Sequence, residues 1–133
     1  MQEKIKNLAS KYHEVVVGHR RHLHAHPELS FQEFETSKYI AAFLKEQGIP
    51  YQGGFVKTGL VAHIKGKNPD KRIIALRADM DALPIVETND VSYKSQNEGV
   101  MHACGHDVHS SSMMGVAMIL NELKDEFEGT IKI

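Results

Sequence analysis

The sequence is poor in cysteine, in excess charge and in long apolar runs. Cys104 is the single cysteine, which excludes an internal disulfide and leaves metal ligation or thiol chemistry for that side chain. Sixteen Lys and Arg residues stand against 17 Asp and Glu residues, so the formal net charge of -1 provides no basic field for nucleic acid or an anionic membrane. We therefore expect neither as a partner.

No apolar run approaches the roughly 20 residues that a membrane-spanning helix needs. The start of the chain, MQEKIKNLASKYHE, also lacks the uninterrupted apolar stretch of a signal peptide. A cytoplasmic location is therefore expected. With 133 residues and 41% hydrophobic content, the chain fits one ordinary globular domain with a real core.

Apolar residues at three- and four-residue steps predict three helices. The first is expected over residues 3–26. The second follows Ser30 and Glu33, which have the form of a capping box, and ends at Gly48. The third is expected from about Asp107 to Lys124. All three are amphipathic, as helices that cover a sheet usually are.

Short apolar segments bounded by turn residues predict strands. They span Gly59 to Gly66, Arg72 to Leu76 and the final Thr130 to Ile133, and the second is expected to be buried on both faces. Residues 80–106 form a long polar connection, a kind of segment that is usually functional. No repeat or linker divides residues 1–133, and the order of elements predicts an α/β layer architecture.

The most distinctive feature is the segment MHACGHDVH, which begins near the end of the polar connection. It gathers side chains that bind metals: His102, Cys104, His106, Asp107 and His109. Cys104 and His106 can reach one site from a turn, because Gly105 between them has no side chain to crowd close ligands. The helix that follows also stabilises a nearby thiolate.

Three interpretations of this segment remain open. A buried cysteine can simply lie beside polar loop histidines. Cys104 can be a nucleophile with a histidine as its base, although a nucleophile and its base normally come from distant segments. Metal binding is the interpretation that the spacing favours.

A second constellation is the segment RADMDALP, where Asp79 and Asp81 follow the predicted strand that ends at Leu76. Ligands collect at the carboxyl ends of strands in open α/β sheets. A solvated acidic turn is the alternative explanation. Next to a metal-binding segment, Asp81 is a plausible carboxylate for orienting a ligand.

The segment HRRHLHAHPE places His19, His22 and His26 on one helical face and His24 on another. Such a stripe can hold a metal ion. We favour a partly exposed helix face instead, because no cysteine or carboxylate completes a ligand set at helical spacing.

Three segments together, RRHLHAHPELSFQE, RADMDALPIVE and MHACGHDVH, resemble one family over most of the chain. This is the amidohydrolase branch of the zinc-dependent aminoacylase and carboxypeptidase family, which includes N-acyl-amino-acid amidohydrolases, hippurate hydrolases, auxin-conjugate hydrolases and N-acetyldiaminopimelate deacetylases. The resemblance implies a three-layer α/β sandwich. Residues 1–133 would be the N-terminal part of its di-metal peptidase-like catalytic domain, without the inserted dimerisation and lid domain.

The resemblance also implies roles for particular residues. Cys104 would be a thiolate that bridges two divalent metal ions, with zinc, manganese, cobalt and nickel as the candidates, and His106 would bind one of them. Asp81 would support the site without touching the metal. Elsewhere in the broader family the strand end carries His-x-Asp, whereas this sequence has Asp79 two residues before Asp81.

Members of this family are several hundred residues long and carry a Glu-Glu pair after a strand like GTIKI, one glutamate acting as the general base. The implied function is metal-dependent hydrolysis of the amide bond in N-acyl amino acids or small peptides, with a homo-oligomeric full-length parent. Because residues 1–133 contain neither this pair nor a third convincing ligand, a truncated non-catalytic fragment or metal-binding module is the alternative. A cysteine-nucleophile hydrolase is less favoured.

Overall fold

The structure, a computed structural model, describes all of residues 1–133. Its helices are α1 (Gln2–Ala25), α2 (Phe34–Glu46), α3 (His106–Glu122) and the short 3-10 helix η1 (Lys124–Glu126). Its strands are β1 (Tyr51–Phe55), β2 (Gly59–Lys65), β3 (Ile73–Ala75) and β4 (Thr130–Lys132). The three helices that the apolar periodicity predicts are therefore present, with ends within two residues of the predicted positions.

The predicted capping box at the start of α2 is wrong. The residue that precedes α2 is Glu33, and no side chain caps the helix from that position. The carboxylate of Glu28 takes this role, because it accepts hydrogen bonds from the backbone N–H groups of Glu35 at 3.1 Å and Thr36 at 2.6 Å. A negative charge also suits the positive end of a helix dipole. Ser30 plays no part in the cap.

The four strands form one mixed sheet in the order β1-β2-β4-β3. The β1–β2 and β2–β4 pairs are antiparallel, whereas β3 and β4 are parallel. β1 was not predicted, because its sequence YQGGF has two glycines and no alternation. It forms because its backbone pairs with β2, and this pairing does not depend on a pattern in its own side chains.

The prediction that the strand around Ile73 is buried on both faces is also wrong. Ile73 is 62% exposed and Ile74 is 42% exposed. β3 is an edge strand, with a neighbour on one side only. A short apolar run is compatible with either position, so its composition alone could not distinguish them.

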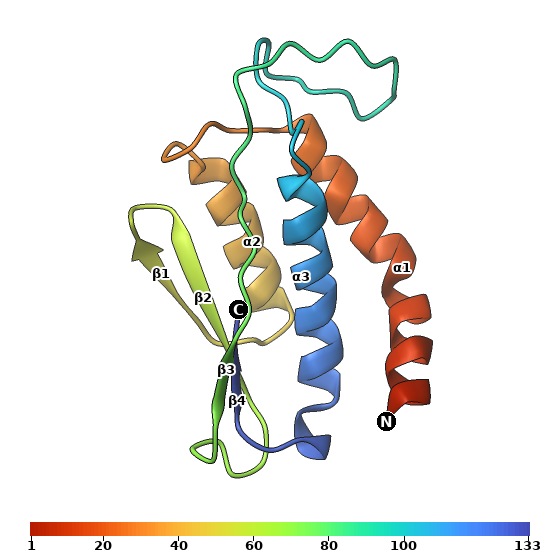
Figure 1. The fold of residues 1–133 in the computed structure, drawn as a ribbon, viewed down its shortest axis with the longest axis vertical. Coiled ribbons are helices and arrows are strands. Elements are labelled where there is room, and N and C mark those ends of the chain that lie inside the picture. The colour runs from red at the N-terminus through yellow and green to blue at the C-terminus, as the bar shows by residue number, and fades with distance from the viewer.

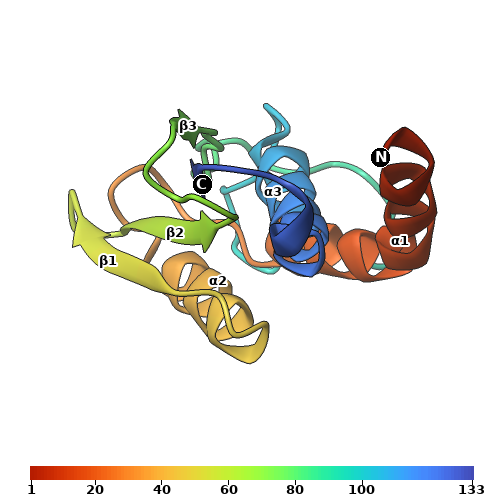
Figure 2. The same cartoon turned by 90° about the horizontal axis from the view of Figure 1, so that it is seen from below.

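The helices lie on one side of the sheet, as Figures 1 and 2 show together. α2 and α3 contact β2, and α1 packs on α3 on the side away from the sheet. Gly115 allows this approach, because a Cβ at that position would lie 2.7 Å from the Val16 side chain. The core between these layers contains Leu23, Phe43, Leu44, Ile49, Ala62, Ile64, Met114, Ala117 and Met118. The α/β class is confirmed.

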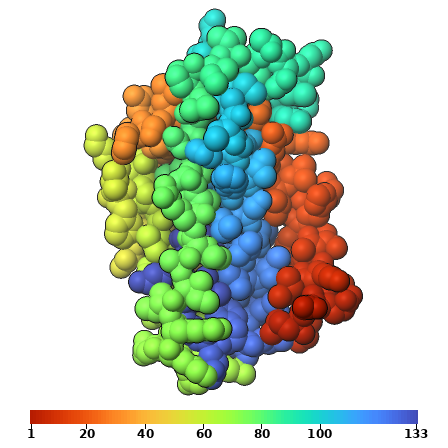
Figure 3. Space-filling model, in the orientation of Figure 1, coloured from red at the N-terminus to blue at the C-terminus, as the bar shows by residue number.

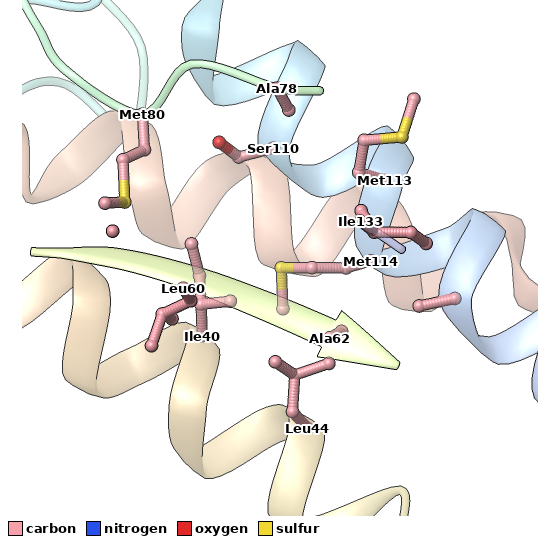
Figure 4. Close-up of a pocket in the computed structure, with 12 residues that line it drawn as sticks. Ile40, Leu44, Leu60, Ala62, Ala78, Met80, Ser110, Met113, Met114 and Ile133 are labelled. Carbon is pink, nitrogen blue, oxygen red and sulfur yellow. The ribbon is translucent and has the colours of Figure 1, made fainter. Parts of the chain in front are cut away.

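An apolar cavity of about 150 Å³ lies between β2, α2, α3 and the segment that follows β3. Figure 4 shows Leu60 and Ile40 facing it from β2 and α2, with Met80 and Met114 on the other sides. The pairing of β2 with the last residues of the chain ends beside it, where Ala62 and Ile133 exchange backbone hydrogen bonds of 2.8 and 3.1 Å. None of the helices is both long enough and apolar enough to cross a bilayer.

The long polar connection crosses one end of the molecule. In Figure 1 the chain leaves β3, runs upward in front of α2 and beside α3, and forms the loop above the helices before it enters α3. Figure 3 shows this segment, coloured green to cyan, along the surface beside α3 and over its start. An isolated bridge between Leu83 and Met101 closes the base of the loop. The segment that follows β3, at Asp79 and Asp81, therefore lies beside the start of α3.

Candidate metal site

The carboxylate of Asp81 meets the imidazole of His106 at this end of the molecule. His106 Nδ1 lies 2.8 Å from Asp81 Oδ1 and 3.0 Å from the Asp81 carbonyl oxygen. Both oxygens accept hydrogen bonds, so Nδ1 carries the proton and the lone pair remains on Nε2. A carboxylate that fixes the ring in this way is the usual partner of a metal-binding histidine. The sequence predicted Asp81 as a carboxylate that orients a metal ligand, and its role and that of His106 in metal binding stay predictions.

The turn before α3 depends on Gly105, which lies immediately before the helix with φ of 94°. This left-handed conformation is open to glycine and unfavourable for other residues. The carbonyl oxygen of Gly105 accepts hydrogen bonds from the N–H groups of Val108 and His109 and so begins α3. The turn leaves Cys104 exposed, two residues before the first residue of α3.

Asp79 and Asp81 have different roles, although they lie two residues apart. Asp79 accepts a hydrogen bond of 2.6 Å from the guanidinium of Arg77 and does not face His106. Its carbonyl oxygen accepts a hydrogen bond of 3.0 Å from the hydroxyl of Ser110 on α3. Asp79 therefore fixes the backbone of the segment, and Asp81 is the carboxylate that serves the histidine.

The histidine stripe on α1 is a packing surface with α2. His19 Nδ1 lies 2.7 Å from the hydroxyl of Tyr39, and the His22 ring stacks on the Tyr39 ring at 3.9 Å between centroids. His22 also stacks on His26. Burial lowers the pKa of His19 and of His22. His19 is half-buried and His22 and His26 are exposed, which agrees with the prediction of a partly exposed helix face.

His24, on another face of α1, belongs to a buried cluster that the sequence did not predict. Its Nδ1 lies 2.7 Å from Asp107 Oδ2, and its Nε2 lies 2.9 Å from Glu87 Oε1. All three residues are at most 5% exposed. The only local signal is that His24 lies between the apolar residues Leu23 and Ala25.

The Glu87 carboxylate is strongly stabilised in its ionised form. Burial works to raise its pKa, but hydrogen bonds from the Ser95 N–H, the His24 ring and the Asn89 amide outweigh it and lower the pKa to about 2. Glu87 thus stays ionised in a buried position because three groups donate to it.

The other two histidines of the MHACGHDVH segment differ in environment. His102 is 5% exposed, and neither of its ring nitrogens has a hydrogen-bond partner. Burial lowers its pKa, although the charge of Asp107 opposes this, so the ring is neutral at pH 7. His109 is exposed, with its ring 5.5 Å from that of His106. Neither contacts Asp81.

The donor set fits part of a metal site. Cys104 supplies an exposed thiol, and His106 supplies an Nε2 with no hydrogen-bond partner. Asp81 and His106 line a groove of about 610 Å³, whose other walls include Phe31, Phe55, Val56 and Arg77. Glu33 also lines it, but its two oxygens already accept from the Phe31 N–H and the Thr58 hydroxyl. No three of the chain's His, Cys, Asp and Glu side chains converge as a metal-holding group.

The chain matches one protein family and several named relatives. Residues 75–133 match the profile of peptidase family M20/M25/M40. The chain is 45% identical over 131 residues to an N-acyl-L-amino acid amidohydrolase of Geobacillus stearothermophilus, covering 98% of this chain and 35% of that protein. It is 48% identical over 122 residues to an N-acetylcysteine deacetylase of Bacillus subtilis, covering 91% of this chain and 32% of that protein.

A solved structure shows the same arrangement of elements. It is the YXEP protein of Bacillus subtilis, described as a dinuclear metal binding peptidase, with a TM-score of 0.87 and 47% identity over 92% of this chain and 35% of that chain. The fold is therefore that of the N-terminal portion of a dinuclear metal peptidase. The chain belongs to peptidase family M20/M25/M40, in its amidohydrolase branch, and corresponds to the N-terminal part of such a protein. The resemblance expected from the sequence is confirmed. It spans about a third of the length of the curated relatives it matches.

Proposed function

We propose that this chain supplies part of the metal site of a metal-dependent amidohydrolase that acts on N-acyl amino acids or small peptides. The observation that carries the proposal is the Asp81–His106 contact of 2.8 Å. In the sequence, only Gly105 separates His106 from the exposed Cys104. The names of the relatives support amide hydrolysis as the reaction. The cytoplasmic location and the homo-oligomeric parent expected from the sequence remain part of this proposal.

His106 and Cys104 are the residues that would hold metal. Asp81 keeps the His106 proton on Nδ1, which leaves Nε2 available as a ligand. Cys104 would bind as the thiolate, next to the start of α3. When bound in such sites, divalent ions lower the pKa of a coordinated water and polarise the scissile carbonyl. The metal would be one of the four that the resemblance implies, zinc, manganese, cobalt or nickel.

The groove that contains Asp81 and His106 would receive the substrate. Its walls include exposed apolar side chains from the β1–β2 hairpin and from the segment before α2. Phe31 and Val56 have φ of 63° and 49°, a left-handed conformation that is unusual for bulky residues and is often found at functional sites. An apolar wall beside a polar pair suits a substrate with an acyl group and a hydrolysable amide.

The test is amide hydrolysis by this chain with a panel of N-acetyl and N-benzoyl amino acids, with added zinc, manganese or cobalt and a chelator control. Turnover that the chelator abolishes supports a complete catalyst. Metal binding that needs Cys104 and His106 but gives no turnover supports a contribution to a larger site. Absence of both contradicts the proposal.

A metal-binding module without turnover is the second candidate. The observation that favours it is that the only glutamate in the groove, Glu33, already accepts two hydrogen bonds, so the groove offers no free glutamate as a base. The cysteine-nucleophile alternative loses support, because no histidine nitrogen is hydrogen-bonded to Cys104 as an activating base would be.

A further inference from the structure

The buried cluster around His24 joins three segments that are far apart in the sequence. His24 is one residue from the end of α1, Asp107 is in the first turn of α3, and Glu87 is in the long polar connection. His24 contacts both carboxylates, at 2.7 Å and 2.9 Å. Arg20 also bridges the start of α3 and the loop, through Asp107 and the ring of Tyr93, but His24 is the side chain within hydrogen-bond distance of carboxylates in both.

Both carboxylates of the cluster have a partner on α1. A carboxylate oxygen lies within hydrogen-bond distance of each His24 ring nitrogen. Arg20 supplies a positive charge, with its Nε 2.9 Å from Asp107 Oδ2. The N–H of this Nε is not aimed at that oxygen, so the contact is an ion pair and not a hydrogen bond. Buried ions are tolerated when each is paired, and removal of one partner leaves a costly unpaired charge.

The end of α1 also holds the loop through its backbone. The N–H of Gln96 donates to the carbonyl oxygen of Ala25 at 2.8 Å, and the Asn97 amide donates to that of Pro27 at 2.6 Å. The Ser95 N–H donates to Glu87, which His24 contacts. The loop therefore has several anchors on α1, whereas Asp107 has only His24 and Arg20 there.

Asp107 directly follows His106 in the chain. Its Oδ1 accepts a hydrogen bond of 2.9 Å from the N–H of Val108, and its Oδ2 faces His24. The first turn of α3 is thus held on its buried side by His24, while His106 meets Asp81 on the groove side. A small rotation of this turn would move His106 away from Asp81.

We propose that His24 is a positioning residue for the candidate metal site, which holds the first turn of α3 through Asp107 and so keeps His106 against Asp81. This inference rests on the proposed function, which identifies the site around His106 as a metal site. His24 touches neither the groove nor a ligand. Its effect passes through the Asp107 carboxylate and the peptide bond to His106.

Two substitutions separate the two contacts of His24. In His24→Asn the amide nitrogen can replace Nδ1 and keep the contact with Asp107. In His24→Gln it can replace Nε2 and keep only the contact with Glu87. The matched control is Leu44→Ala, which opens the core on α2 without touching the cluster. All variants are compared at a temperature at which they remain folded.

The first measurement is the ring ¹⁵N spectrum of His106 at mildly alkaline pH, which distinguishes a proton on Nδ1 from one on Nε2. We expect a single Nδ1–H form in the wild-type chain, in His24→Asn and in Leu44→Ala. We expect a mixture of both forms in His24→Gln. An unchanged His106 spectrum in His24→Gln overturns the positioning role, and so does an equal change in Leu44→Ala, because that would reflect general loosening.

The second measurement is a cobalt(II) titration followed through the thiolate-to-cobalt absorption band of Cys104. We expect His24→Gln to weaken cobalt binding about tenfold, with His24→Asn within about twofold of wild type. If the wild-type chain shows no such band but the His106 spectrum changes in His24→Gln, the metal site fails and the positioning role stands. If cobalt binds and His24→Gln changes neither readout, the metal site stands and the positioning role fails. Where the two readouts differ, the His106 spectrum decides.

Discussion

Replacement of Glu87 by glutamine should remove the part of the pH dependence of folding stability that comes from the Glu87 carboxylate. The pKa of Glu87 is about 2 in the folded chain, against an ordinary value of 4.5. At about 1.4 kcal/mol for each pKa unit, the ionised carboxylate stabilises the fold by roughly 3 kcal/mol. Because the folded pKa is the lower one, this contribution is fully present above pH 4.5 and is lost as the pH falls towards 2.

The assay is urea unfolding followed by far-ultraviolet circular dichroism at several pH values between neutral and strongly acidic. For the wild-type chain, we expect Glu87 to account for a fall of roughly 3 kcal/mol in the free energy of unfolding across this window. Glu87→Gln should be less stable at neutral pH by a similar amount and should lack this part of the fall. Glu98→Gln, an exposed glutamate of the same loop, is the control. Parallel pH profiles for wild type and Glu87→Gln would refute the reasoning.

Three further outcomes are expected. Asp81→Ala should weaken cobalt binding by about 10- to 100-fold in calorimetry, because the His106 ring loses its carboxylate; unchanged affinity would contradict that role. Gly105→Ala should lower stability in thermal melts by about 1–2 kcal/mol because of its φ of 94°, whereas Gly18→Ala, inside α1 with open space around it, should raise stability by about 0.5–1 kcal/mol. The apolar cavity of Figure 4 should either bind the dye ANS, seen as dye fluorescence, or make the chain self-associate, seen in analytical sedimentation. A monomer that gives no dye fluorescence would count against an accessible apolar surface.

The sequence predicted the helices well, because each has an apolar stripe that is long enough to show the helical period. It predicted β2 for a similar reason. It missed β1, whose glycines carry no pattern and whose pairing depends on β2. It located the strand around Ile73 but wrongly predicted its burial, because a three-residue apolar strand looks the same at an edge as in the centre of a sheet.

The candidate site divides in the same way. The sequence singled out Asp81 and His106 separately, because one residue follows a strand and the other begins a helix in recognisable segments, and the structure adds the contact between them. The contacts of His24 had no such signal, since Asp107 is 83 residues away and Glu87 is 63 residues away in the sequence. No local pattern encodes a buried ion pair between such distant segments. Their meeting depends on how α1 packs on α3.

The most direct test of the central claim is a cobalt(II) titration of the wild-type chain beside Cys104→Ala and His106→Ala, followed through the thiolate-to-cobalt band and confirmed by metal analysis. The account predicts a band in the wild-type chain that is absent from Cys104→Ala and much weaker in His106→Ala, because both side chains would hold the ion. Equal metal content in all three proteins, without a thiolate band, would contradict the assignment of Cys104 and His106 as ligands.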